Sequence, residues 1–209
     1  MSQRNFFTMA LWIGLAAVLA TGCAGSSPRS KYYLLSALPE TEAVPAADTA
    51  AAGISLGIGP VSLPDYLDRP QIVMRTGPNE VSFSEFDRWA EPLPANFLRV
   101  FRQDLADLLK TDSIFIYPWA PGAVFEFQVS AEVARFDARP GAGAWLEVQW
   151  QVRRHQDGQV VLTRSSSYHA DLDGSDVKAV VAAQSRTLGD FSRDVAQALT
   201  AIYRQEHGR

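Results

Sequence analysis

The sequence is poor in cysteine and histidine. Cys23 is the only cysteine among 209 residues, which excludes an internal disulfide and every zinc site built from several cysteines. The histidines are His155 and His169, both beside expected turns, and His207 in the terminal tail, and solvated surface is the default for such positions. No G-x-S-x-G sequence marks a hydrolase nucleophile. We therefore assign no catalytic residue and do not expect an enzyme.

The chain also lacks an excess of positive charge. Its 19 lysines and arginines are outnumbered by 23 aspartates and glutamates, which gives a formal net charge of −4 at pH 7. A mildly acidic chain gains nothing from counterion release on nucleic acid or from a basic patch on anionic lipid headgroups. We expect no nucleic-acid partner, and membrane association has to come from acyl chains.

Sequence patterns for cofactors and metal ions are missing too. Gly57-x-Gly59 follows an expected strand but leads into Pro60 rather than into a helix, so it is no phosphate cradle. The acid-rich segment 171–176 lacks the glycine and glutamate positions of an EF-hand loop, and helix capping with turn formation explains its acids. We expect no metal ion, and no cofactor other than covalently attached lipid.

The only long apolar run lies at the N-terminus. It is an uncharged stretch of about 15 residues, 6–20, which is the length of a signal-peptide core rather than of a membrane span. It leads into Thr21-Gly22-Cys23, which resembles the lipobox of bacterial lipoproteins. The resemblance implies a signal peptide over 1–22, cleavage between Gly22 and Cys23, and diacylglycerol plus an N-linked acyl chain such as palmitate on Cys23. Cleavage at another bond, or an uncleaved anchor, is the alternative.

The residues that follow the leader predict a tether and then one domain. Residues 23–31 are mostly small and polar, and an extended chain of this length reaches roughly 30 Å. Residues 32–209 suit a single domain whose core needs no disulfide. Ala24 stands where aspartate is the usual signal for retention in the inner membrane. We therefore expect the protein at the periplasmic face of the outer membrane.

Hydrophobic periodicity predicts short strands and two helices. Strands are expected over 32–35, 54–58, 71–76, 80–85, 113–117, 125–133, 146–153 and 160–168. Apolar residues three and four apart indicate one helix from Pro94 to Leu109. A second helix runs from a Ser175 cap to Ile202, with Gly189 as a weak point.

The order of these elements indicates the fold class. Asp157-Gly158 joins the last two strands as a hairpin, Gly59-Pro60 is expected to end the second strand, and 39–52 is expected to be a loop. Each helix offers one apolar stripe, so both are expected on the same side of the sheet. We expect an α+β domain, an antiparallel or mixed β-sheet with two amphipathic helices packed on one face.

Several motifs together resemble a known family. They are Tyr-Tyr-Leu-Leu at 32–35, the block IGPVSLPDYLDRPQIV at 58–73, and RWAEPL at 88–93 leading into a helix. In this order and spacing they are similar to the PqiC/YmbA family of ABC-type transport auxiliary lipoproteins. The resemblance covers essentially the whole mature chain.

The resemblance implies a function. It implies a non-enzymatic outer-membrane lipoprotein that faces the periplasm and works beside an MCE-domain protein and an inner-membrane ABC-type transporter, which move lipids or other hydrophobic molecules between membranes. The chain is then expected to tether the MCE assembly to the outer membrane, alone or as a homo-oligomer. The alternative is a lipid-carrier lipoprotein with an acyl-binding cavity. A filled core favours the tether, whereas a long apolar cavity favours the carrier.

Two of the motifs hold the candidate partner contacts. In the loop 63–70 two prolines stiffen the chain around Tyr66 and Arg69, which makes either a structural bend or a rigid contact surface. Arg88 and Trp89 stand just before a helix, either as an ion-paired arginine beside a core aromatic residue or as interface anchors. Both interpretations stay open, and these four side chains are the candidate contact residues.

Overall fold

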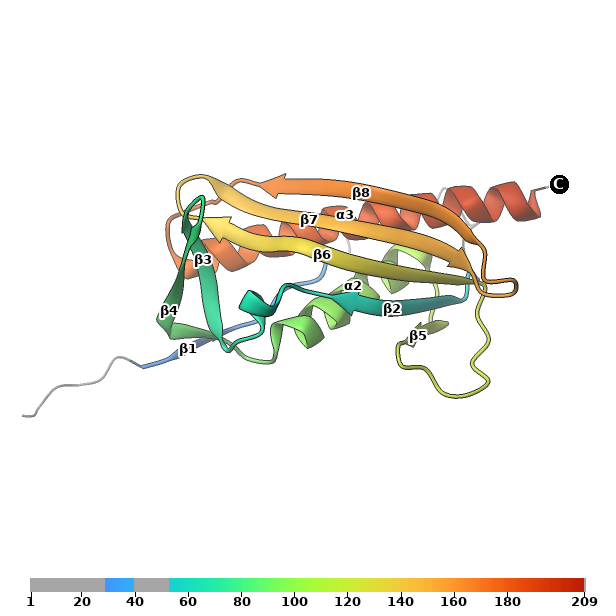
Figure 1. Ribbon diagram of the computed structural model, residues 1–209, viewed down its shortest axis with the longest axis horizontal. Coiled ribbons are helices and arrows are strands. Elements are labelled where there is room, and N and C mark those ends of the chain that lie inside the picture. Colours follow the sequence, from blue (N-terminus) through green and yellow to red (C-terminus); the bar gives the residue numbers. More distant parts are fainter. Residues whose placement is uncertain (1–28, 40–52, 209) are drawn as a thin grey trace, which may run out of the picture.

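Eight strands form one mixed sheet in the computed structural model, which describes residues 29–39 and 53–208 (Figure 1). The strands are β1 (Lys31–Tyr33), β2 (Leu56–Ser62), β3 (Gln71–Gly77), β4 (Glu80–Trp89), β5 (Ile114–Ile116), β6 (Phe127–Arg139), β7 (Gly143–Arg154) and β8 (Val160–Ala170). The helices are α2 (Leu93–Leu109), α3 (Val177–His207) and the short 3-10 helix η3 (Asp65–Leu67). The expected α+β class is confirmed, while most of the expected loop 39–52 lies outside the described residues.

The sheet has a branched strand order around β6. One path runs β1-β4-β3-β6-β2-β5, and β7 and β8 extend the sheet from β6 as the expected antiparallel meander. One extra residue in β6, between Val133 and Arg135, shifts its register against β7. Because strand side chains alternate between faces, this bulge moves the core-facing positions of β6 from odd to even numbers. Asp137 is thereby turned away from the helices.

Both helices pack on the same face of the sheet, as expected (Figure 1). Phe101 of α2 stacks on Phe191 of α3 with ring centroids 4.8 Å apart, and the Trp150 ring of β7 lies 6.0 Å from Phe191. Phe97 meets Phe136 of β6 edge to face at 5.3 Å. No helix in the described part combines the length and apolarity that a bilayer span requires.

The start of α3 and its middle differ from the expectation. Asp176 rather than Ser175 is the N-cap, because its carboxylate accepts the backbone N–H of Ala179 at 2.8 Å. The helix runs unbroken through Gly189, the expected weak point. A Cβ at Gly189 would lie 2.4 Å from a methyl group of Leu38. The glycine therefore makes room for the N-terminal segment to cross the helix.

The expectation that Gly59-Pro60 ends β2 is wrong. The strand continues to Ser62, paired in parallel with β5 on one side and with β6 on the other. A register shift between Ile58 and Val61 accommodates the proline, which cannot donate to the ladder. Residues 56–59 are all buried, so β2 is a central strand and not the half-buried one that its alternation indicated. β5 pairs with β2 only as far as Ile58, so pairing with β6 alone continues the strand beyond Gly59-Pro60.

Candidate functional site

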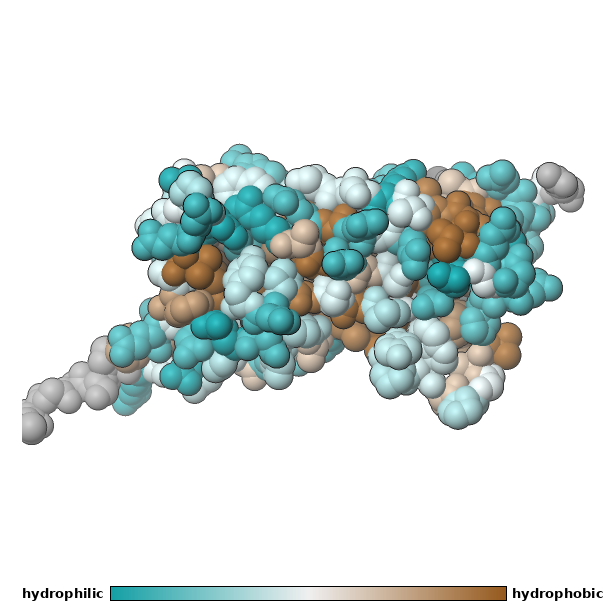
Figure 2. Space-filling view, in the orientation of Figure 1, coloured by the Kyte–Doolittle hydropathy of each residue, from teal (hydrophilic) through white to brown (hydrophobic). Residues whose placement is uncertain are grey.

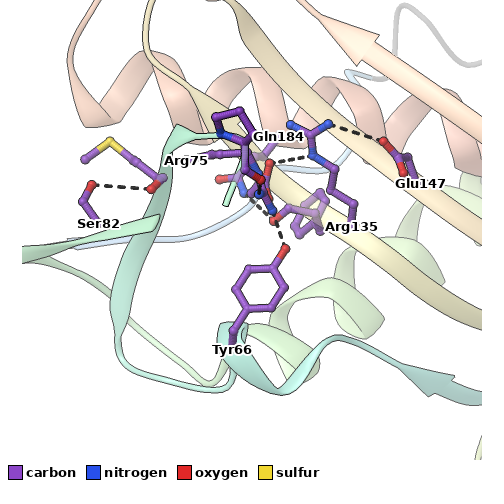
Figure 3. Close-up of polar contacts among 10 residues, drawn as sticks. Tyr66, Arg75, Ser82, Arg135, Glu147 and Gln184 are labelled. Atoms are coloured by element: carbon purple, nitrogen blue, oxygen red, sulfur yellow. Dashed lines mark hydrogen bonds and ion pairs between the residues drawn. The ribbon is translucent and has the colours of Figure 1, made fainter. Parts of the chain in front are cut away.

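A buried acid, Asp137, fastens the loop that carries Tyr66 to the sheet (Figure 3). The Asp137 side chain is fully buried and accepts hydrogen bonds at 2.8 Å from Arg75 Nη2 and from Arg135 Nε. The Tyr66 hydroxyl donates to the same carboxylate at 3.1 Å. Arg135 also reaches Glu147 of β7 at 3.4 Å. We call Tyr66, Arg75, Arg135 and Asp137 the Asp137 clamp, since one carboxylate joins η3, β3 and β6.

The protonation states of Asp137 and Tyr66 do not change near neutral pH. Burial alone would raise the pKa of Asp137, but the hydrogen bonds from Arg75 and Arg135 outweigh it and hold that pKa below its usual value. Burial, reinforced by the Asp137 charge, raises the pKa of Tyr66 to about 12. Asp137 therefore stays ionised and Tyr66 stays protonated, which suits a structural clamp rather than a group that exchanges protons.

Arg69, the second candidate contact residue, packs on an exposed aromatic ring. Its Nε donates to the Tyr66 carbonyl at 2.9 Å, and its guanidinium carbon lies 4.0 Å from the centroid of the Phe83 ring. Leu67 of the same loop is buried in the core. The loop 63–70 is therefore a structural bend that is fixed to the core by the buried Leu67 side chain. A partner contact through Arg69 stays a prediction.

Arg88 and Trp89 point to opposite sides of β4. Trp89 is 5 % exposed and packs in the core, and its backbone N–H donates to the Pro70 carbonyl at 2.8 Å. Arg88 is half-buried, and its Nε has no hydrogen-bond partner in the described part of the chain. The expected ion pair of Arg88 is not formed with any carboxylate among residues 29–39 and 53–208. Trp89 thus serves packing, while Arg88 is left without a charged partner there.

The four candidate contact residues gather at one end of the molecule. We call this end the tether end and define it by β1, the β3–β4 hairpin and η3, where the described chain begins (Figure 1). The pairing of β1 with β4, the hydrogen bond from the Trp89 N–H to the Pro70 carbonyl and the packing of Arg69 on Phe83 join these elements. Cys23, the expected attachment site, and the expected cleavage bond after Gly22 lie outside the described residues.

An aromatic cluster lies at the opposite end, in the connection from β5 to β6 (Figure 1). Ring centroids are 5.3 Å apart for Tyr117–Trp119, 4.8 Å for Trp119–Phe125, 5.8 Å for Phe115–Phe125 and 4.0 Å for Phe125–His155. Tyr117 is 50 % exposed and Val124 is 79 % exposed. We call residues 117–125 the distal loop, because they lie toward the end of the molecule opposite the tether end (Figure 1).

Two glycines of β2 make room for the rings of the distal loop. A Cβ at Gly57 would lie 2.6 Å from the Phe125 ring, and one at Gly59 would lie 2.5 Å from Tyr117 Cβ. Gly59 also has a φ of +124°, which other residues rarely adopt. In the sequence, the pattern Gly57-x-Gly59 is the signal of this close packing, although it indicates no phosphate site. The two glycines leave space for the side chains of Phe125 and Tyr117.

Replacing Gly59 with alanine is expected to displace the distal loop. The new Cβ meets Tyr117 Cβ, close to the loop backbone, in addition to the cost of its positive φ, so we expect a loss of about 3 kcal/mol in the free energy of unfolding. Gly122→Ala is the matched control, because Gly122 has a φ of +85° but no atom near the added Cβ. Urea unfolding, followed by tryptophan fluorescence, measures the difference in unfolding free energy between the two variants. Equal losses of unfolding free energy in the two variants would contradict the claim that Gly59 makes room for Tyr117.

A surface depression of about 490 Å³ adjoins the distal loop. Its lining residues are Ser55, Val124, Phe125, Glu126, Phe127, Arg154, His155, Gln156, Glu206 and His207. Arg154 is paired with Glu206 and with the neighbouring Asp157, and His207 Nε2 lies 3.4 Å from Glu126. Phe125 and Phe127 are buried beneath this surface, and its exposed apolar side chain is Val124.

The remaining polar candidates have structural contacts. His169 Nε2 lies 3.1 Å from the Ala142 carbonyl, and Asp173 pairs with Arg186 at 3.0 Å. Within the described ranges, no group of three or more histidine, cysteine, aspartate or glutamate side chains is placed to hold a metal ion. These residues form turns, a cap and surface ion pairs.

The sequence matches a known family over most of the folded part. A profile of the ABC-type transport auxiliary lipoprotein component matches residues 33–196. The chain belongs to this family. The resemblance carried by the motifs is thereby confirmed. Members of the ABC-type transport auxiliary lipoprotein family are auxiliary components of transport systems and not a known family of enzymes, which implies a transporter as partner and a location in the cell envelope.

Two solved structures share the fold of this auxiliary lipoprotein. A protein from Xanthomonas campestris has a TM-score of 0.72 and 17% sequence identity, and the match covers 86% of this chain and 100% of that protein. An uncharacterized protein has a TM-score of 0.66 and 16% identity, with 82% and 99% covered. At such identities the likeness shows the fold alone. No curated protein sequence matches the chain.

Proposed function

We propose that this auxiliary lipoprotein is a non-enzymatic tether at the periplasmic face of the outer membrane. Acyl chains on Cys23 hold it there, residues 23–31 link it to the bilayer, and residues 32–209 form one domain that receives an MCE assembly of an intermembrane lipid transport system. The family match over 33–196 carries the proposal. The lipobox-like sequence Thr21-Gly22-Cys23 supports the anchoring.

The packing of the core favours a tether over a lipid carrier. Aromatic rings fill the layer between sheet and helices, including Phe97, Phe101 and Trp150, each at most 1 % exposed. The depressions found among the described residues have volumes of about 300 to 700 Å³, open to solvent, and their linings mix polar with apolar groups. An acyl carrier needs an enclosed apolar cavity. These depressions do not meet that requirement, which supports the tether over the carrier.

We place the contact with the MCE protein at the distal loop. Its rings are held by one another and by the two glycines of β2, so little conformational entropy is lost when a partner binds. Tyr117 and Val124 are exposed there, and aromatic residues are enriched at the centres of protein interfaces. A contact far from the acyl chains also lets one molecule hold a membrane and an MCE assembly at once, so a modest interface suffices.

Photo-crosslinking in native cell envelopes tests this placement. A photo-reactive amino acid at Tyr117 is expected to give a product that contains an MCE-domain protein, identified by mass spectrometry. The matched control carries the same group at Gln149, which is exposed on the open face of β7. Products of Tyr117 that contain only a second copy of this chain would assign the distal loop to a homo-oligomer, and recovery of no MCE protein from either position would contradict the tether.

A further inference from the structure

Exposed apolar side chains collect at the tether end. Tyr32 is 65 % exposed, Leu34 47 %, Phe83 46 % and Phe86 36 %, and all four belong to β1 and β4 or directly follow β1. Figure 2 shows apolar patches among polar residues at this end, near the point where the described chain begins. Aromatic side chains of this size gain free energy when they are removed from water. The exposed apolar side chains of the tether end are therefore available for contact with another molecule or surface.

The register of β1 with β4 places an arginine within this surface. Tyr32 is paired with Arg88, which puts these two side chains on one face of the sheet, and the exposed Phe86 lies two residues before Arg88 in β4. Arg69 lies on the neighbouring Phe83 ring. We call Tyr32, Leu34, Phe83 and Phe86, together with Arg69 and Arg88, the seat.

The two arginines of the seat differ from the arginines of the Asp137 clamp. Arg75 and Arg135 are paired with Asp137, whereas in the described ranges no ion pair joins Arg69 or Arg88 to a carboxylate. Exposed acids lie on the same elements at Asp65, Asp68, Glu80 and Glu85. Counted over β1, the loop 63–70 and the β3–β4 hairpin, four basic residues (Lys31, Arg69, Arg75 and Arg88) stand against five acids (Asp65, Asp68, Glu80, Glu85 and Asp87), a formal charge of −1. Guanidinium groups without a carboxylate partner are suited to binding phosphate.

We propose that the seat rests on the phospholipid surface of the leaflet that holds the acyl chains. The proposal rests on the anchoring through Cys23. The tether restricts the occupant, because the chain from Cys23 to Lys31 reaches roughly 30 Å and enters the domain within the seat itself. The seat is thus the part of the domain that stays nearest to the bilayer. Aromatic rings enter the interfacial layer, and Arg69 and Arg88 bind lipid phosphates.

This contact fixes the orientation of the domain. A tether alone would let the domain tumble, whereas a seated domain points its opposite end away from the membrane. The distal loop at 117–125 then faces the periplasm, where the proposed MCE partner approaches (Figure 1). Because the attraction is mainly apolar, and the acids of the tether end balance most of its positive charge, membrane binding by the seat should change little with salt concentration.

Fluorescence quenching in vesicles tests the seat. The acylated full-length protein is inserted into vesicles of phosphatidylethanolamine and phosphatidylglycerol that contain a spin-labelled headgroup lipid. Acylation blocks the thiol of Cys23, so a Glu85→Cys variant takes a fluorescent label at one place only. The label at 85 is expected to be strongly quenched, while a label in Ala120→Cys, in the distal loop, is expected to stay unquenched.

Variants of the seat complete the test. Phe83→Ser with Phe86→Ser is expected to remove most of the quenching at 85 while the protein still floats with the vesicles. The matched control is Val124→Ser, which removes a still more exposed apolar side chain from the distal loop and should leave the quenching at 85 unchanged. Equal quenching at 85 and 120, or quenching that survives the double substitution, would overturn the proposal. A crosslink from position 85 to a second copy of this chain would also overturn it. Failure to float would instead disprove the anchoring.

Discussion

Replacing Cys23 with alanine is expected to move the protein from the membrane to the soluble fraction with its domain still folded. The leader is exchanged for one cut by the general signal peptidase, so that an uncleaved leader cannot act as an anchor. Each buried CH₂ of an acyl chain contributes about 0.8 kcal/mol, and the seat alone replaces little of that, so membrane partition should fall at least on the order of 100-fold. Flotation in a density gradient measures partition, and circular dichroism checks the fold.

Two controls separate acyl anchoring from other causes of membrane binding. Cys23→Ser should behave as Cys23→Ala does, because a serine hydroxyl is not acylated by the lipoprotein route. High salt should not change the release, since the mature chain has no excess of positive charge. Persistent flotation of both variants in high salt would show that the folded domain binds the membrane without acyl chains.

Replacing Asp137 with alanine is expected to cause the largest loss of stability of any single polar substitution that we propose. The change leaves Arg75 and Arg135 without their carboxylate and the Tyr66 hydroxyl without its acceptor. Breaking a buried ion pair costs about 3–5 kcal/mol, and we expect the lower end because both arginines are about a quarter exposed. Urea unfolding measures the loss.

The control for this substitution is Asp173→Ala, which removes an ion pair with Arg186 from the surface. The Asp173 side chain is 81% exposed, so the loss should stay below about 1 kcal/mol. Similar losses in the Asp137 and Asp173 variants would mean that the Asp137 clamp does not hold the loop 63–70 to the sheet.

The stabilisation by Asp137 is expected to disappear in acid. Because its folded pKa lies below its unfolded value, the contribution is present above about pH 4 and is lost as the pH falls through the folded pKa. Asp137→Asn cannot titrate. The stability difference between the native protein and Asp137→Asn should therefore narrow below about pH 4. A difference that stays constant from pH 7 to pH 3 would contradict the lowered pKa.

Elements that depend on local pattern could be predicted from the sequence. The three-and-four spacing of α2 and α3 and the period of two in β6, β7 and β8 produce those elements because each has one face toward the core. The turn at Asp157-Gly158 joins β7 to β8 as expected. The parallel pairings of β2 with β5 and β6 could not be predicted, since they join residues more than fifty positions apart. The pairing with β6 carries β2 through Gly59-Pro60.

The sites were harder to predict because they depend on tertiary contacts. Asp137 alternates with Arg135 and Arg139 in β6, a pattern that equally suits a solvent-facing strand. Only the fold brings Arg75 and Tyr66, more than sixty residues away in sequence, to its carboxylate. The residues at 66, 69, 88 and 89 come from two separate motifs, and the sequence did not indicate that they lie near one another. Only the structure distinguishes Tyr66 of the Asp137 clamp, Trp89 of the core and the two half-buried arginines.

Mass spectrometry of the mature amino terminus tests the central claim most directly. The protein is purified from membranes, digested, and its first peptide is sequenced. We predict a peptide that begins at Cys23 and carries the mass of diacylglycerol and an N-linked acyl chain. A peptide that begins elsewhere, an unmodified Cys23, or an intact leader would contradict the account, because the domain would then have no fatty attachment to the outer membrane.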